Sequence, residues 1–313
     1  MTALDMAHAF RSIEEVRSKL DPVADLEGTD AIDLLRRTMA RSTIRLVEQV
    51  PVVELDEDPE GIHDARVAAR RLRSDLRTFG PVLHPSWAKP LRAELGWVGA
   101  LLGRIRDAEV LVARLGVRIE SIADPGIAAG KMLLDDLELQ RVGARRRLLE
   151  GLRSERFGTL VDRLVEGAIE PRSVEGGIAD AAEAAGALMS RPWGRLVRAA
   201  GRLGPQPEDA ELHRVRIEVK RVRYAAEAFS PALGTRADRF AAAARKLQDL
   251  LGEHHDAVVS LAWLTANGIG ADDTSVAFAA GRLAEYESME RDRYRDAWPK
   301  AWARLDKRKR FWT

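Results

Sequence analysis

The sequence predicts an all-α protein made of two similar antiparallel helical bundles. Apolar residues recur at three- and four-residue spacings along nearly every long segment, and runs with period two are almost absent. In addition, the segment Asp30 to Leu83 matches Asp180 to Leu233 without a gap, at an offset of 150 positions. This offset is the size of a domain, whereas solenoid repeats recur about every 20–50 residues. We therefore interpret the two halves as products of an internal duplication.

The apolar periodicity places the helices at residues 5–20, 29–50, 61–79, 86–115, 128–168, 176–203, 209–229, 235–265 and 273–306. Breaks are expected where glycine and proline cluster. These clusters are Gly80-Pro81, Asp124-Pro125-Gly126, Pro171 and Gly204-Pro205-Gln206-Pro207. Pro51-Val52-Val53 is the only strand-like stretch, and it is too short to form a sheet. The interruption that starts at Pro171 divides the chain into a first bundle, residues 1–172, and a second, residues 173–313.

The composition limits the possible classes of protein. With 313 residues, 46% of them hydrophobic, the chain can bury two cores. The absence of cysteine excludes disulfides and thiolate metal sites. The start shows no secretory signal, and no run of about 18 uncharged apolar residues occurs, so we expect a cytoplasmic protein without a membrane partner. No nucleotide-binding loop or nucleophile motif appears, and we expect no cofactor.

Two of the expected helices carry a row of cations at matched positions, although the net charge of the chain is only +1. At 100° per residue, one sector about 80° wide on helix 61–79 holds five such side chains. They are His63, Arg66, Arg70, Arg73 and Arg77. Helix 209–229 repeats the row as His213, Arg216, Lys220 and Arg223. Glu227 stands where Arg77 would be, so the second row is one cation shorter.

These rows are costly for a helix that serves stability alone, because like charges four residues apart destabilise it by about 0.2–0.5 kcal/mol per pair. Their recurrence in both halves therefore indicates a ligand rather than a solvated face. The planar arginine fork engages two phosphate oxygens at once. Forks about 5.4 Å apart, one helical turn, can follow a chain of phosphates.

A second motif also occurs twice, as Leu102-Gly103-Arg104-Ile105-Arg106-Asp107 and as Leu251-Gly252-Glu253-His254-His255-Asp256. Glycine inside a helix costs about 1 kcal/mol relative to alanine, so its recurrence suggests a close approach of two helices. We expect the basic members of this motif to add donors to the same site; they are Arg104, Arg106 and His255. We expect Asp107 and Asp256 to orient the arginines of the rows.

These residues resemble the conserved-histidine α-helical domain (CHAD) family, most closely from Leu212 to Tyr224 and in both copies of the glycine motif. The resemblance covers roughly Ala31 to Leu305. It implies two four-helix bundles related by a pseudo-twofold axis, with a basic central surface that binds inorganic polyphosphate, and association with polyphosphate granules. No Glu-x-Glu-x-Lys signature occurs near the start, so the chain resembles a stand-alone member without a triphosphate-tunnel domain. Glu227 and Glu253 depart from the family pattern and suggest a weaker second half of the site.

Two other functions fit parts of the pattern. His254-His255-Asp256 is similar to the His-Asp pair of metal-dependent phosphohydrolases, with His63-Asp64 as a second ligand pair. However, Arg106-Asp107, the repeat partner of His255-Asp256, cannot ligate a metal, so we expect no metal and no catalytic residues. The rows could also contact a nucleic-acid backbone, but no aromatic residues interleave with them to stack on bases.

The sequence therefore predicts a non-enzymatic protein that binds inorganic polyphosphate, with nucleic-acid binding and phosphohydrolysis as alternatives. The basic tail from Lys307 to Trp312 either helps to anchor the protein to anionic granules or is a solvated end. The oligomeric state stays open.

Overall fold

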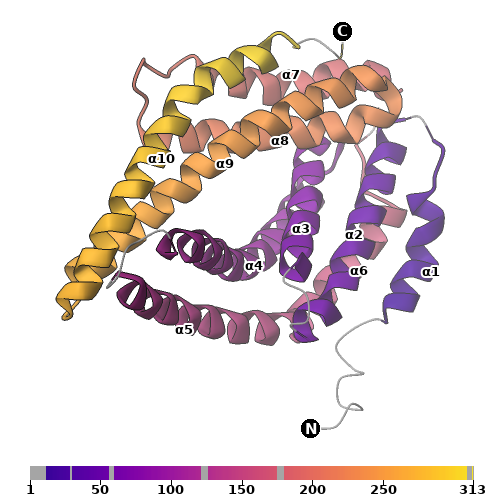
Figure 1. Cartoon of the computed structure of the whole chain (residues 1–313). Coiled ribbons are helices and arrows are strands. Elements are labelled where there is room, and N and C mark those ends of the chain that lie inside the picture. The colour runs from indigo at the N-terminus through magenta and orange to yellow at the C-terminus, as the bar shows by residue number, and fades with distance from the viewer. Residues whose placement is uncertain are drawn as a thin grey trace, which may run out of the picture.

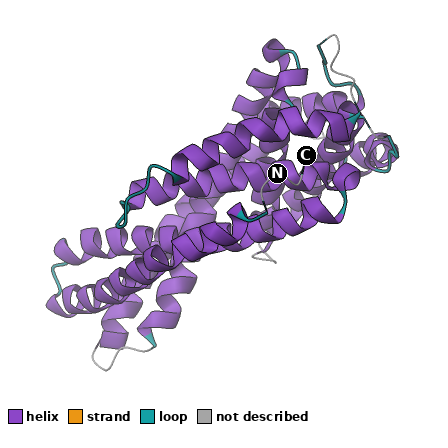
Figure 2. Ribbon diagram, turned by 90° about the horizontal axis from the view of Figure 1, so that it is seen from above, coloured by secondary structure: helices purple, strands orange, loops and turns teal. Residues whose placement is uncertain are grey.

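The computed structural model describes residues 12–28, 30–55, 60–120, 126–174, 180–308 and 312. Within these ranges the chain forms α-helices, one short 3-10 helix at Gly80–Val82 and no β-strand, which confirms the all-α prediction (Figure 2). The helices are α1 (Ile13–Ala24), α2 (Ala31–Leu55), α3 (Glu60–Thr78), α4 (Pro85–Ile119), α5 (Gly126–Leu152), α6 (Glu155–Ile169), α7 (Ala181–Ala200), α8 (Asp209–Leu233), α9 (Thr235–Ile269) and α10 (Thr274–Asp306). No helix in the described ranges is both long and apolar enough to cross a membrane.

The helices of the second half follow those of the first at the offset seen in the sequence. α4 covers residues 85–119 and α9 covers 235–269, so both of their limits differ by 150. α2 and α7 begin at Ala31 and Ala181, the same distance apart. The four helices α7 to α10 thus correspond to α2 to α5. The first half adds α1 and α6, which pack against α2 (Figure 1).

Equivalent residues of the two halves meet each other, as a twofold relation between the halves requires. The rings of Phe79 and Phe229 pack with their centroids 5.3 Å apart. An isolated antiparallel bridge joins Asp30 to Asp180. Both pairs differ by 150 positions. The halves are therefore arranged about an approximate twofold axis, which brings α3 next to α8.

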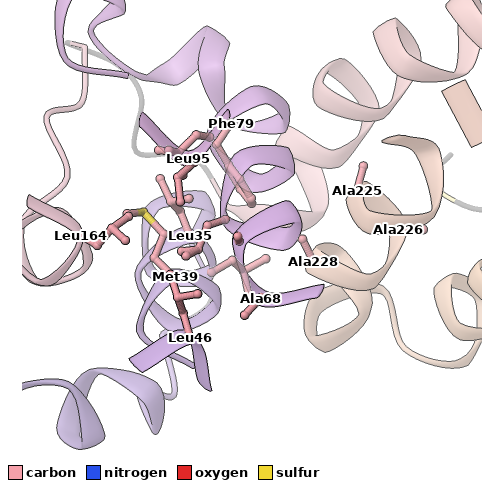
Figure 3. Close-up of a cluster of buried hydrophobic side chains, with 14 of the residues drawn as sticks. Leu35, Met39, Leu46, Ala68, Phe79, Leu95, Leu164, Ala225, Ala226 and Ala228 are labelled. Carbon is pink, nitrogen blue, oxygen red and sulfur yellow. The ribbon is translucent and has the colours of Figure 1, made fainter. Parts of the chain in front are cut away.

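Both hydrophobic cores contain residues of both halves. The larger core includes Met39, Leu46 and Leu164 of the first half together with Ala225 and Ala228 of α8 (Figure 3). A smaller core joins α4 and α5 to α9 and α10, with Leu115, Leu133, Leu264 and Ala279 among its members. The expected division at residue 172 thus separates two sets of helices that share their cores, and independent folding of each half stays a prediction.

The helix expected at 128–168 is wrong, because the chain breaks there into α5 and α6. Ser154 caps α6: its hydroxyl accepts a hydrogen bond from the Phe157 amide at 3.3 Å, and serine is a favoured N-cap residue. The expected end of the second helix at residue 50, before the strand-like stretch at Pro51, is also wrong. Pro51 lies within α2, which continues to Leu55 and buries Val53 in the core.

The expected start of the first helix, residues 5–11, lies outside the described residues, as do Asp124, Pro125 and residues 309–311 of the basic tail. α1 begins after Ser12, whose hydroxyl accepts a hydrogen bond from the Glu15 amide. Of the tail, Lys307 and Arg308 are exposed. Trp312 is 9% exposed, and its ring packs at 6.0 Å from the rings of Trp193 and Phe240. Trp312 is therefore docked on the second bundle, whereas the two described cations of the tail face solvent.

Candidate anion-binding site

Side chains from both halves line one cavity of about 380 Å³. The cavity lies where α3 and α4 of the first half meet α8 and α9 of the second. Most of the residues expected to bind phosphate are found here: His63, Arg66, Arg70, Arg106, His213, Arg216 and His255. Both expected orienting carboxylates, Asp107 and Asp256, also line it. We call it the central cavity.

The apolar faces of α3 and α8 direct the cations into the central cavity. On α3, Ala65, Leu72 and Leu76 are buried in the core. On α8, Val215 and Val219 are buried in the same way. Because a helix that buries one face must present the opposite face elsewhere, the rows point away from the core, except for Arg223 at the end of the α8 row, which is buried. The approximate twofold axis then places the two rows across one space from each other.

Gly103 makes room for a guanidinium group rather than for a neighbouring helix. A Cβ atom at Gly103 would lie 3.1 Å from Arg66 Nη1, and no backbone atom of another helix lies within 4 Å of that position. Arg66 Nη1 donates hydrogen bonds to the Gly103 carbonyl at 2.9 Å and to Asp107 Oδ1 at 3.0 Å. The expected close helix approach is therefore wrong here, because an arginine side chain fills the space.

The same arrangement recurs along the groove between α3 and α4 and in the second half. A Cβ atom at Gly96, seven residues before Gly103, would lie 3.5 Å from Arg73 Cζ. A Cβ atom at Gly252 would lie 4.0 Å from Arg216 Nε. Glycines on α4 and α9 thus clear the space into which arginines of α3 and α8 extend.

In the second half, two histidines meet at the central cavity, whereas in the first half Arg106 stands at the position that corresponds to His255. His213 Nδ1 lies 3.1 Å from His255 Nδ1, a hydrogen bond in which one ring donates to the other. Burial, followed by the nearby charge of Arg216, lowers the pKa of His255 to about 3. Burial and then Arg106 lower the pKa of His63. The rings of His63 and His255 are therefore neutral at neutral pH.

Cations of both halves repel one another at the central cavity. Burial is the main cause that lowers the pKa of Lys220 to about 7, and Arg216 and Arg70 lower it further. Burial also lowers the pKa of Arg216, whereas the neighbouring carboxylate of Asp256 acts to raise it. The cavity thus contains more positive charge than its two carboxylates compensate.

Several predicted residues do not line the central cavity. Arg104 is exposed and lines none of the cavities described here, because it points about 200° away from Arg106 on the same helix. Arg223 is buried: its guanidinium lies 4.5 Å from the Tyr224 ring and its Nε atom 3.7 Å from Glu227. Arg73 is exposed farther along α3, and Arg77 lines a second cavity. Lys220 does not line the central cavity either, but it lies close enough to Arg216 for the charge of that arginine to lower its pKa.

The motifs did not reveal four further lining residues, Val110, Leu111, Val259 and Ser260. They follow Asp107 and Asp256 by three or four residues, so they occupy the same helix faces one turn later. Their spacing from the two aspartates could have identified them as lining residues. Because their side chains are apolar or small, however, no binding motif includes them.

His254 does not join His255 and Asp256 in a metal-ligand set. It is 2% exposed, and its Nε2 atom lies 3.1 Å from Asp209 Oδ1, outside the cavity lining. Consecutive residues of a helix point about 100° apart, which separates His254 from His255. Among the described residues, no three histidine, aspartate or glutamate side chains are grouped to hold a metal ion.

The chain belongs to the CHAD domain family, whose model matches residues 37–265. The fold is similar to that of PptA from Streptomyces chartreusis, with a TM-score of 0.73 and 25% identity over 88% of this chain and 100% of that chain. It is also similar to the CHAD domain from the plant Ricinus communis, with a TM-score of 0.69 and 26% identity over 89% of this chain and 94% of that one.

Two uncharacterised proteins of Mycobacterium tuberculosis, from strains CDC 1551 / Oshkosh and ATCC 25618 / H37Rv, are each 31% identical to this chain over 263 residues. The match covers 79% of this chain and 48% of each relative. The chain thus spans about half the length of the curated relatives that it matches.

Proposed function

We propose that this protein binds inorganic polyphosphate in the central cavity. The observation that carries the proposal is the convergence of cations from both halves on a single space, with Arg66 and Arg70 facing Arg216. Membership of the CHAD family supports polyphosphate-related binding at the level of the family. We also propose that the protein associates with polyphosphate granules.

A bound polyanion would relieve the repulsion between the cations of the central cavity. Burial lowers the pKa values of His255 and Lys220 most, and the positive charge of Arg216 lowers both further. Phosphate oxygens in the cavity would offset this cost and accept charge-assisted hydrogen bonds, each worth about 1.5–3 kcal/mol. Arg66 is already held by Asp107, so less side-chain freedom is lost when it binds.

The proposed role is binding without catalysis. The two carboxylates of the cavity lie beside arginines, where Asp107 orients Arg66 instead of activating water. We expect no release of phosphate from polyphosphate incubated with the protein, and binding that is unchanged by a metal chelator. Chelator-sensitive phosphate release would instead show a metal-dependent phosphohydrolase.

Isothermal titration calorimetry with polyphosphates of graded length tests the proposal. The variant Arg66→Ala/Arg216→Ala should lose most of the binding, because it removes one fork from each row. Arg236→Ala/Arg239→Ala is the matched control, since both residues are exposed at the start of α9, far along the chain from the lining residues. Affinity should also fall as salt rises, because a bound polyanion releases its counterions.

Two results would overturn the proposal. One is a polyphosphate affinity that is the same at low and high salt. The other is displacement of long-chain polyphosphate by duplex DNA at equal phosphate concentration, which would favour the nucleic-acid alternative.

A further inference from the structure

A second cavity, of about 220 Å³, lies beside the end of α3, the start of α4 and the middle of α7. Its lining contains cations and no acidic residue. The cations are Arg77, Lys89, Arg92, Arg191 and Arg195. Within the described part of the chain, only Arg195 of these five has a carboxylate partner, Glu218, at 3.3 Å. We call it the side cavity.

The cations of the side cavity are close enough to perturb one another. Burial lowers the pKa of Arg77 to about 10, with further contributions from Arg221 and Arg92. Burial, followed by Arg73, lowers the pKa of Arg92, whose buried Nε atom has no hydrogen-bond partner. Uncompensated charge at a part-buried position is costly, and an anion would remove that cost.

The equivalent region of the second half shows what a compensated arrangement looks like. Glu227 stands in place of Arg77 and accepts hydrogen bonds from Arg71 at 2.5 Å and from Arg245 at 3.2 Å. At the position that corresponds to Arg92, α9 carries an alanine, Ala241 or Ala242 according to the offset of 149 or 150. The approximate symmetry of the fold therefore does not require a cationic cavity at this position. In the first half, by contrast, Arg77 and Arg92 line the side cavity without a carboxylate partner among the described residues.

The row on α3 leads from the central cavity to the side cavity. Arg70 lines the first and Arg77 lines the second, and seven residues of helix separate them by about 10 Å. Arg73 lies between them, exposed, with its guanidinium over Gly96 of α4. The α8 row ends differently, because Arg223 turns to Tyr224 and Glu227.

We propose that a polyphosphate chain in the central cavity continues past Arg73 and ends in the side cavity, so that the protein favours chains long enough to occupy both. This inference rests on the proposed function and adds a direction to it: the polyphosphate leaves the central cavity along α3 and not along α8. The side cavity is small, which suits the last phosphates of a chain rather than a bulky anion such as a nucleic acid.

The test compares tripolyphosphate with long-chain polyphosphate by calorimetry, using the variant Arg92→Gln/Arg191→Gln. We expect the long-chain affinity to fall about tenfold or more, the value of one or more charge-assisted contacts, and the preference for long chains to shrink by the same factor. Arg236→Gln/Arg239→Gln removes the same charge from the start of α9 and should keep both affinities. A thermal melt of each variant checks that the fold is retained.

Each other outcome contradicts the inference in a recognisable way. A long-chain affinity equal to that of the control variant would show that the side cavity is not used. Equal losses for tripolyphosphate and long chains would show a separate anion site, not a continuous path. If the unaltered protein bound no polyphosphate at all, the proposed function itself would fail together with this inference. If Arg92→Gln/Arg191→Gln still bound tripolyphosphate and preferred long chains as strongly as the unaltered protein does, the path to the side cavity would be wrong and the proposed function would stand.

Discussion

Lys220 allows the cost of a part-buried cation beside the central cavity to be measured. Its pKa is lowered from 10.5 to about 7, mainly by burial and then by Arg216 and Arg70. At about 1.4 kcal/mol per pH unit, this shift corresponds to roughly 4 kcal/mol against the folded state at pH 7. Water and counterions reach the part-exposed side chain and reduce that value. We therefore expect Lys220→Gln to raise the free energy of unfolding by about 1–2 kcal/mol in the absence of ligand.

Thermal unfolding followed by circular dichroism measures this effect. For a chain of this size the expected rise in Tm is about 2 to 4 °C at pH 7. The unfolded lysine keeps its proton up to its ordinary pKa, whereas the folded one loses it above about pH 7, so the unaltered protein gains stability between pH 7 and 10. The advantage of the variant should therefore shrink over that range. The same variant should bind polyphosphate more weakly, since it lacks one cation.

Lys246→Gln is the matched control, because Lys246 is exposed on α9 and should leave Tm and affinity unchanged. A lower Tm for Lys220→Gln than for the unaltered protein at pH 7 would refute the reasoning. An advantage that stays constant from pH 7 to 10 would do the same, because it could not come from the proton on Lys220.

Three further predictions concern protons, burial and space. Polyphosphate should raise the lowered pKa values of His63 and His255, so binding should take up protons and strengthen as pH falls below about 7; binding enthalpies that are the same in buffers of different ionisation enthalpy would contradict this. Asp75→Asn should raise the free energy of unfolding at pH 8 and not below pH 4, because burial raises the pKa of Asp75 to about 7 and its Oδ2 atom has no hydrogen-bond partner; urea unfolding at both pH values checks it, and an equal gain at both would contradict it. Gly103→Ala should weaken polyphosphate binding by displacing Arg66, while Gly99→Ala on the same helix, with nothing within 4 Å of its Cβ position, should not; equal affinities of the two variants in calorimetry would disprove this role for the glycine.

The local periodicity of the chain was sufficient to place most of the helices and both basic rows. Its failures have local causes. Ser154 ends a long periodic segment by capping α6, and the hydroxyl of one serine leaves no trace in the apolar pattern. Pro51 was expected to lie outside a helix, but burial of Val53 in the core stabilises the last turn of α2.

The contacts that a single arginine makes depend on the residues packed around it in the folded protein. Arg66 and Arg223 occupy similar rows, yet Arg66 extends to Asp107 whereas Arg223 is held by Tyr224 and Glu227. The position of Arg77 on its helix suggested the same site as Arg70. The end of α3 instead faces α7, where other cations gather. Such partners are distant in the sequence, and no spacing within one helix could identify them.

By itself, the sequence determined that two helices each carry a cationic face opposite an apolar one, because the position of a side chain around a helix depends only on residue number. Only the tertiary structure decided where those faces point. The packing of apolar faces about the approximate twofold axis brings Arg66 and Arg216 to one cavity, and it sends Arg77 to another. Contacts between the halves join residues 150 or more positions apart, and they depend on how whole helices fill the core.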